Sequence, residues 1–207
     1  FESAVLHAHG EVHVVSRVVG FKKIKFFTNE NVGSGELDLP EQEMHTTGCW
    51  ITIPRPVMTS LPYGGDDRRD GVIGVSYAMR QVAQLLLMCD GHDVGISIGN
   101  GNAVASGRGP AGATNAVGGT GQSPVDFDEP RIFVYDNYPG GIGLAEPLFA
   151  MRHELLAGTR DLIASCPCES GCPSCVGPLG EVGPLAKRVA LDLLGRITGQ
   201  WAPGGGQ

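Results

Sequence analysis

The stretch Cys166-Pro-Cys-Glu-Ser-Gly-Cys-Pro-Ser-Cys175 holds four of the chain's six cysteines at C-x-C-x₃-C-x₂-C spacing. Thiolates packed this densely repel one another unless a cation binds them, and Zn²⁺ accepts four cysteine sulfurs in a tetrahedron. A glycine before the third cysteine can adopt the left-handed turn that brings this cysteine back toward the first pair. The spacing therefore favours a closed structural zinc site with these ligands: Cys166, Cys168, Cys172 and Cys175.

Two other uses of this cluster stay open at this point. A cubane iron–sulfur cluster also takes four cysteines, although the usual C-x₂-C-x₂-C spacing is absent, and two disulfides are the remaining possibility. The other two cysteines, Cys49 and Cys89, lie in apolar segments and are predicted to be buried free thiols. Unpaired cysteines without a secretory segment indicate a cytoplasmic protein, where disulfides are rare.

Composition and charge limit the functions that the chain can have. Its 207 residues are 42% hydrophobic, which is enough for one buried core, and no apolar run is long enough to span a membrane. The net charge of −7 opposes strong autonomous binding to nucleic acid. Four basic residues nevertheless lie close together early in the chain: Arg17, Lys22, Lys23 and Lys25. They either contact phosphates or form a solvated face of a strand. Because the sequence begins at Phe1 without a methionine, we expect it to be part of a longer protein.

The hydrophobic pattern predicts about five strands and three principal helices. The strands are expected at Leu6–Val19, Lys22–Phe27, Met44–Ile53, Asp93–Ile98 and Arg131–Tyr135. Within the second strand, Ile24 and Phe26 are expected to point inward, and the turn residues of 29–35 predict a loop. The helices are expected from Gly71 to Cys89, from Gly143 to the cysteines, and from Gly183 to Gly199.

Two further patterns suggest sites. His7, His9 and His13 share one parity of the first strand, so they are either half-exposed strand residues or ligands of a catalytic metal. Gly140 and Gly141 precede a predicted helix, where exposed peptide N–H groups could bind a phosphate. A tight turn required by packing explains the same residues and is the favoured interpretation.

The remaining segments predict less structure. Gly, Ala, Ser, Thr and Asn dominate residues 99–128, which we expect to form a flexible insertion, and residues 200–207 are expected to be a disordered tail. No G-x-x-x-x-G-K-[ST] motif occurs in the chain, so the chain is not expected to be an ATPase or another enzyme by itself.

Several phrases together resemble a known helicase domain. They are Lys22-Lys-Ile-Lys-Phe-Phe27, Asn31-Val-Gly-Ser-Gly-Glu36, Leu39-Pro-Glu-Gln-Glu-Met-His-Thr-Thr47, Met88-Cys-Asp90, Tyr135-Asp-Asn-Tyr-Pro-Gly-Gly-Ile-Gly-Leu-Ala-Glu146 and Cys166–Val176. The resemblance is to the C-terminal zinc-binding domain of MrfA-like (YprA-type) superfamily 2 DNA helicases. The cysteine signature and the Tyr-Pro-Gly-Gly segment are its most specific parts.

The resemblance implies a parent enzyme with two upstream RecA-like ATPase domains, which translocates 3′ to 5′ on DNA and serves DNA repair. It also implies that the four cysteines hold structural zinc. We therefore expect residues 1–199 to form one α+β domain, with a mostly antiparallel sheet and a zinc knuckle between the last two helices. This domain should be a non-catalytic, DNA-holding module of a cytoplasmic, nucleoid-associated helicase. The alternatives are an independent metalloenzyme that uses the histidines and an iron–sulfur redox module.

Overall fold

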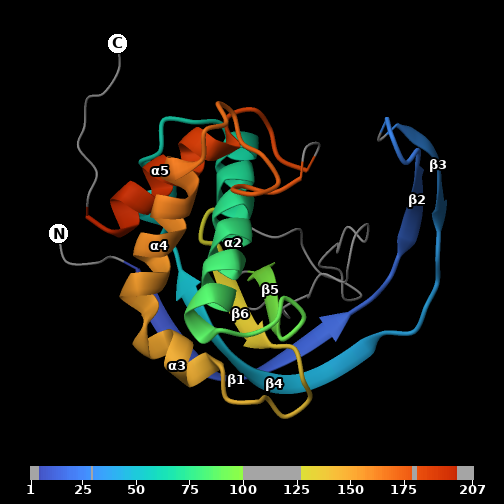
Figure 1. Cartoon of the computed structure of the whole chain (residues 1–207), viewed down its shortest axis with the longest axis horizontal. Helices are drawn as coiled ribbons and strands as arrows, with labels where there is room; N and C mark the ends of the chain where they lie inside the picture. Colours follow the sequence, from blue (N-terminus) through green and yellow to red (C-terminus); the bar gives the residue numbers. More distant parts are fainter. Residues whose placement is uncertain (1–4, 29, 100–126, 179–180, 200–207) are drawn as a thin grey trace.

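A four-stranded antiparallel sheet with helices packed on one face forms the centre of the computed structural model (Figure 1). The structure describes residues 5–28, 30–99, 127–178 and 181–199. In chain order its elements are β1 (Leu6–Ser16), β2 (Gly20–Ile24), β3 (Asn31–Glu36), β4 (Gln42–Thr52), α1 (Arg55–Thr59), α2 (Gly65–Leu87), β5 (Val94–Gly99), β6 (Arg131–Asp136), α3 (Ala145–Ala150), α4 (Arg152–Ser165) and α5 (Ala186–Ile197).

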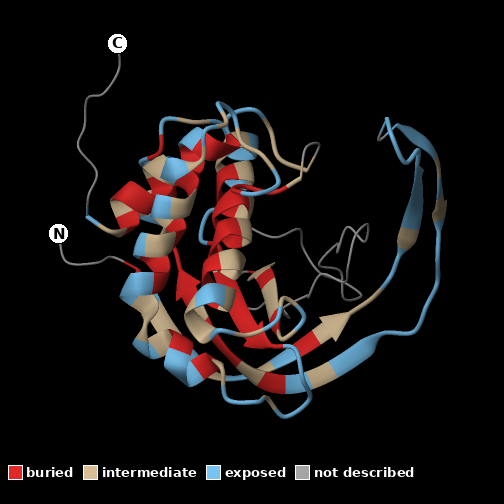
Figure 2. Cartoon of the chain, in the orientation of Figure 1, coloured by how far each residue is buried: buried red, intermediate tan, exposed pale blue. Residues whose placement is uncertain are grey.

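The sheet has the strand order β1-β4-β6-β5, and every neighbouring pair is antiparallel. Strand β1 pairs with β4 along its whole length, from Leu6 opposite Thr52 to Ser16 opposite Gln42. The second half of β4 is buried because β1 and β6 flank it and the helices cover one face (Figure 2).

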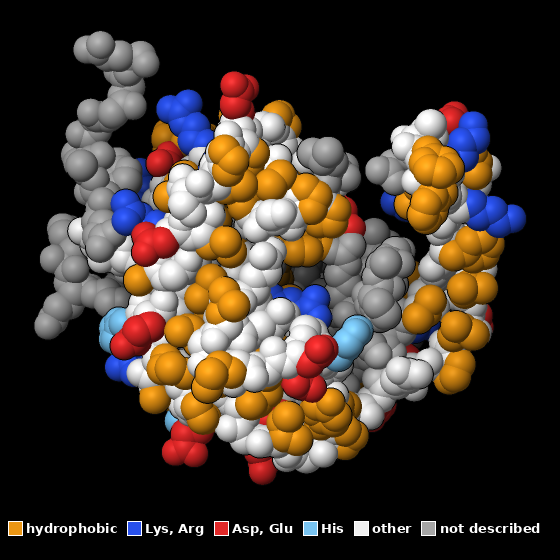
Figure 3. Space-filling view, viewed as in Figure 1, with side chains coloured by type: hydrophobic (Ala, Val, Ile, Leu, Met, Phe, Trp, Pro, Cys, Tyr) orange, Lys and Arg blue, Asp and Glu red, His pale blue; other side chains and the backbone are white. Residues whose placement is uncertain are grey.

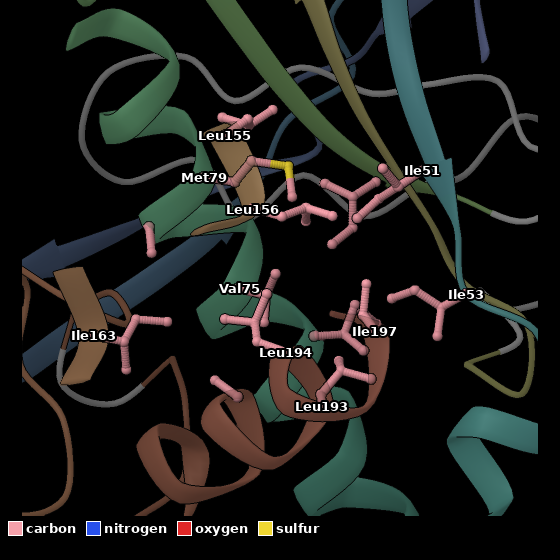
Figure 4. Packing of buried hydrophobic residues seen from close by; sticks show 14 of the residues in the cluster. Ile51, Ile53, Val75, Met79, Leu155, Leu156, Ile163, Leu193, Leu194 and Ile197 are labelled. Carbon is pink, nitrogen blue, oxygen red and sulfur yellow. The ribbon is translucent and has the colours of Figure 1, made fainter. Parts of the chain in front are cut away.

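The main core lies between the sheet and the helices α2, α4 and α5. Figure 4 shows residues of all three helices pointing toward Ile51 and Ile53 of β4. Helices α2 and α5 approach closely at Gly71, where a Cβ atom would lie only 2.4 Å from a Val189 methyl carbon. The second long helix predicted from the sequence is divided into α3 and α4 at Met151, whose φ of −90° and ψ of 23° are not helical.

Strands β2 and β3 form a separate two-stranded ribbon that extends from the ends of β1 and β4, away from the helices (Figure 1). The predicted loop at residues 29–35 is therefore wrong: most of it is strand β3, and its glycines Gly33 and Gly35 pair with β2. The inward orientation predicted for Ile24 and Phe26 is also wrong, because the ribbon leaves the body and these side chains are 52% and 90% exposed.

The predicted fold class is confirmed: the chain is α+β, with a mostly antiparallel sheet and a cysteine cluster between the last two helices. The described residues form six strands in two sheets, and two short helices accompany the three long ones. Of the predicted insertion, residues 100–126 lie outside the described residues, as do residues 200–207. The boundary at residue 199 stays a prediction. No described helix is both long enough and apolar enough to cross a membrane.

Candidate metal centre

The sulfur atoms of Cys166, Cys168, Cys172 and Cys175 all lie within 4.8 Å of one another. The separations are 3.5 Å between Cys166 and Cys172, 3.5 Å between Cys168 and Cys175, and 3.7 Å between Cys172 and Cys175. Four sulfurs bound to Zn²⁺ at about 2.3 Å stand about 3.8 Å apart at the corners of a tetrahedron. The donor set therefore has the size and chemistry of a closed zinc site, and these four residues would hold the ion.

The alternatives for the cluster fit this geometry less well. The cysteines are free thiols, and sulfurs 3.5 Å apart are much farther from each other than the roughly 2.05 Å of a disulfide bond. A cubane carries its irons at separate corners, so its cysteine ligands must stand farther apart than the sulfurs found here. Cys49 and Cys89 are also free thiols; Cys49 is buried and Cys89 is half-buried.

The backbone around the cysteines turns sharply enough to bring them together. Helix α4 ends as Cys166 becomes extended, and the peptide N–H groups of Cys175 and Val176 both donate to the carbonyl oxygen of Cys172. Gly171 has a φ of +124°, and a Cβ atom there would lie 2.3 Å from a Val176 methyl carbon. Only glycine fits this position, because it needs both a left-handed backbone and an empty side-chain space.

The two cysteines of the second pair differ in acidity. A hydrogen bond from the Ser174 backbone lowers the pKa of Cys172 to about 7, whereas burial raises the pKa of Cys175 to about 12. Cys172 is therefore the more readily ionised thiol of this pair at neutral pH. Bound zinc would supply the positive charge that keeps the buried Cys175 in the thiolate form.

Lys187 of α5 is a component of this centre that the sequence analysis missed. Its side chain is buried, and its Nζ atom donates to the carbonyl oxygens of Cys166 and Cys168, at 2.6 Å each. The same nitrogen lies 3.7 Å from the Cys168 sulfur. Zinc with four thiolates carries a net charge of −2, so a buried ammonium group beside them offsets part of that charge.

The cluster is attached to the helical core at several points. Val176 is fully buried and packs against Gly74 of α2, where a Cβ atom would lie 3.0 Å from the Val176 Cβ. Beyond the cluster, the Gly183 N–H group donates to an Asp70 carboxylate oxygen at 2.7 Å. The arrangement connects α4 and α5 to α2, so the metal site can stabilise the fold, and it offers no open coordination position for chemistry.

The histidines of β1 are not brought together. His13 stacks on His45 at 4.3 Å, His9 contacts the Phe149 ring, and the nearest ring to His7 is that of His153 at 6.4 Å. Among the described residues, the four cysteines are the only group of three or more His, Cys, Asp or Glu side chains that could hold a metal ion. The arrangement of His7, His9 and His13 therefore gives no support to the metalloenzyme alternative.

The turn after β6 already contains an anion of the protein itself. Asp136 is buried, and one of its carboxylate oxygens accepts hydrogen bonds from the N–H groups of Ile142, Gly143 and Leu144. The N–H group of Gly140 donates to His45, and that of Gly141 donates to Tyr138. Because these N–H groups already have acceptors within the protein, Gly140 and Gly141 are better explained as part of a tight turn than as a phosphate-binding site. In the sequence, the feature that indicates this turn is Asp136, which stands shortly before the glycines.

The four early basic residues fall into two groups. Arg17 forms an ion pair with Asp38 at 2.7 Å, and Lys25 forms one with Glu30 at 2.9 Å. Lys22 and Lys23 are exposed on β2, and neither has an acidic side chain within ion-pair distance among the described residues. The ribbon is also more basic than the rest of the chain, since residues 20–36 carry three lysines and two glutamates.

Comparisons with known proteins agree with this geometry. Residues 75–176 match the profile of the MrfA Zn-binding domain family. The chain is 34% identical over 190 residues to "Uncharacterized ATP-dependent helicase YprA" of Bacillus subtilis. The aligned region covers 92% of this chain and 22% of that protein. A stretch of 49 residues is 41% identical to an uncharacterized protein of Methanocaldococcus jannaschii, covering 24% of this chain and 44% of that protein.

Two crystal structures of the DUF1998 helicase MrfA are also similar. The one bound to DNA has a TM-score of 0.62 and 32% identity, and the similarity covers 95% of this chain and 23% of that one. The one bound to DNA and AMPPNP has a TM-score of 0.51 and 31% identity over 93% of this chain and 22% of that one. The chain thus spans about a fifth of the length of these relatives. From its cysteine geometry and these similarities, the chain contains a zinc-binding domain of the MrfA-like helicases.

Proposed function

We propose that this chain is the zinc-binding module of an ATP-dependent DNA helicase that translocates 3′ to 5′ and serves DNA repair. The observation that carries the proposal is the similarity, along 92% of the chain, to a protein named as an ATP-dependent helicase. The similar MrfA structures were determined with DNA bound, which supports DNA as the partner of the parent enzyme. Such a parent acts on nucleoid DNA in the cytoplasm.

The module contributes position and rigidity to the parent rather than ATP hydrolysis. Its sequence has no phosphate-binding loop, so ATP is bound and hydrolysed by RecA-like domains elsewhere in the parent chain. The zinc site and the closely packed helices make a rigid body beside those domains. A rigid body that holds DNA while the ATPase domains move converts translocation into strand separation.

The ribbon supplies the DNA contact in this proposal. Lys22 and Lys23 are exposed and have no acidic partner in the described parts of the chain, so both ammonium groups are available to phosphates. Arg17 and Lys25 are already neutralised locally by carboxylates and contribute less. With a net charge of −7, the isolated module binds DNA weakly, and the contact takes effect when the ATPase domains hold DNA nearby.

The test is the double variant Lys22→Glu/Lys23→Glu in the full-length helicase, with DNA affinity measured between 50 and 200 mM salt as in standard salt titrations. We expect weaker binding, slower unwinding and a flatter plot of log affinity against log salt. Two lost phosphate contacts reduce the slope by about 1.8. ATPase activity without DNA should be unchanged, because the nucleotide site lies in other domains.

A charge-preserving control separates the ammonium charges from the fold of the ribbon. Lys22→Arg/Lys23→Arg keeps both charges and should retain the salt slope. If the glutamate variant keeps the wild-type affinity, slope and unwinding rate, these lysines form a solvated face and the DNA contact proposed here is wrong.

A further inference from the structure

The turn between β2 and β3 carries two phenylalanines at the outer end of the ribbon. Phe26 and Phe27 lie in this turn, which is closed by a hydrogen bond from the Lys25 N–H group to the carbonyl oxygen of Glu30. Their side chains are 90% and 93% exposed, and hydrophobic and basic atoms gather at this end of the ribbon, apart from the body of the molecule (Figure 3). We call Phe26 and Phe27 the aromatic tip.

The two rings of the aromatic tip are accessible to a ligand. They contact each other edge to face, with centroids 5.2 Å apart and planes at 88°, and this arrangement leaves flat ring faces open to solvent. Side chains so exposed add nothing to the core of the domain, so the fold does not account for two adjacent phenyl rings in water. An exposed aromatic pair of this kind indicates a binding surface.

The charge beside the aromatic tip is positive. Lys22 and Lys23 lie three to five residues before the rings and have no acidic side chain within ion-pair distance in the described part of the chain. Glu30, after the turn, is already neutralised by Lys25 at 2.9 Å. A ligand that fits this surface therefore offers flat apolar groups and negative charges within about 17 Å, the greatest length that five residues span.

Single-stranded nucleic acid combines these two properties. Its bases present flat faces that stack on aromatic side chains, and its phosphates bind lysine ammonium groups. An apolar protein surface also accepts the rings, but burying Lys22 and Lys23 beside them without acidic partners is unfavourable. In a duplex each base face is covered by neighbouring bases, so a phenyl ring reaches it only where the strands are apart.

We propose that the aromatic tip stacks on an unpaired DNA base while Lys22 and Lys23 bind neighbouring phosphates. The ribbon then selects single-stranded over double-stranded DNA, and it does so for any base, because every base has a flat face. This inference rests on the proposed function, to which it adds a contact with the bases. The lysines bind phosphates of either form of DNA, whereas the rings distinguish the two forms.

The first test compares two forms of DNA on the full-length helicase with the double variant Phe26→Ala/Phe27→Ala. Affinity for a single strand should fall about tenfold, whereas affinity for a duplex of the same length should not change. Phe26→Tyr/Phe27→Tyr keeps the rings and should bind single strands like the wild type. Phe26→Leu/Phe27→Leu keeps apolar side chains without flat rings and should lose most of the affinity that the alanine variant loses. Zinc content and ATPase activity without DNA should stay unchanged in all three variants, because these side chains are exposed.

The second test identifies the contact directly. A forked DNA carries 5-iodouracil either in its unpaired arm or in its duplex, and on irradiation this base forms a crosslink to an aromatic side chain that contacts it. The peptide that contains Phe26 and Phe27 should be crosslinked to the unpaired arm and not to the duplex.

Four results would overturn the stacking proposal. They are no loss of single-strand affinity in the alanine variant, an equal loss for both forms of DNA, crosslinks that never include the tip peptide, and wild-type affinity in the leucine variant, which would indicate that the tip docks on protein. The Lys22→Glu/Lys23→Glu variant separates this failure from that of the proposed function. If the lysine variant weakens binding to both forms and the alanine variant does not weaken binding to single strands, stacking alone fails. If the full-length protein shows no DNA-stimulated ATPase activity, the proposed function fails as well.

Discussion

Replacing Lys187 by methionine removes the ammonium group beside the cysteine cluster and nearly preserves the side-chain volume. The group donates hydrogen bonds of 2.6 Å to two carbonyl oxygens, and the side chain is only 9% exposed. Methionine cannot donate to either oxygen, so both lose a charged donor.

The size of the effect follows from these contacts. A hydrogen bond with a charged partner contributes about 1.5–3 kcal/mol to stability. Cys166 and Cys168 are half-buried, so water can donate to their carbonyl oxygens in place of the ammonium group. We therefore expect each lost hydrogen bond to cost an amount near the lower end of this range. The free energy of unfolding of the zinc-bound protein should therefore fall by about 2–4 kcal/mol, which for a chain of this size lowers Tm by about 5–15 °C.

Two measurements check this expectation on the purified chain. Thermal unfolding followed by circular dichroism gives the change in Tm, and competition with a coloured chelator gives the zinc affinity, which should fall at least about tenfold. Lys187→Arg keeps the charge and should lie between the wild type and Lys187→Met. Arg188→Gln removes a positive charge from the exposed neighbouring position of α5 and serves as the matched control.

A Lys187→Met variant that binds zinc as tightly as the wild type and unfolds at the same temperature would refute a stabilising role for the ammonium group. In that case the carbonyl oxygens find equally good donors in water, and the buried lysine does not stabilise the cluster.

Three further outcomes are expected. Cys172→Ser should lose the bound zinc, measured by elemental analysis, and unfold at a lower temperature; a metal-free protein with full thermal stability would contradict a structural role for zinc. Gly171→Ala should destabilise the fold by about 2–4 kcal/mol, because a left-handed backbone and a Cβ atom 2.3 Å from Val176 are both unfavourable. Gly143→Ala also places a Cβ atom on a backbone with positive φ, but into open space, and should cost only about 1 kcal/mol. Denaturant titration measures both variants, and equal losses would show that the contact with Val176 is unimportant. The isolated chain should release no phosphate from ATP, with or without DNA, and activity above a blank would reveal a site that the sequence does not show.

The parts of the molecule that local sequence determines could be predicted. The cysteine site is one of them, because its four ligands lie within ten residues and need only a turn at Gly171 to converge. Strands β1, β4 and β6 could be predicted as well, since their apolar and β-branched residues are concentrated in short segments.

The parts that depend on distant partners could not be predicted. Strand β3 is rich in glycine and polar residues and has the composition of a loop, so only its pairing with β2 makes it a strand. Lys187 binds main-chain oxygens that lie 19 and 21 residues away, and main-chain atoms leave no pattern in a sequence. The orientation of Ile24 and Phe26 depends on the ribbon leaving the body, which alternation of residues within one strand does not reveal.

The way in which the ribbon joins the body determines how it bears mechanical load. Strands β1 and β4 lead directly into β2 and β3, and both leave the sheet at the same end. A force applied along the ribbon axis moves β1 and β4 together. The pairing of β4 with β6, from Gly48–Tyr135 to Thr52–Arg131, then resists this force. Hydrogen bonds that run across the strands are then loaded in parallel, in shear, and must break together. A sideways pull that spreads the ribbon would instead peel β1 from β4 one pair at a time. The ribbon should therefore be stiff under axial tension and compliant when it is spread.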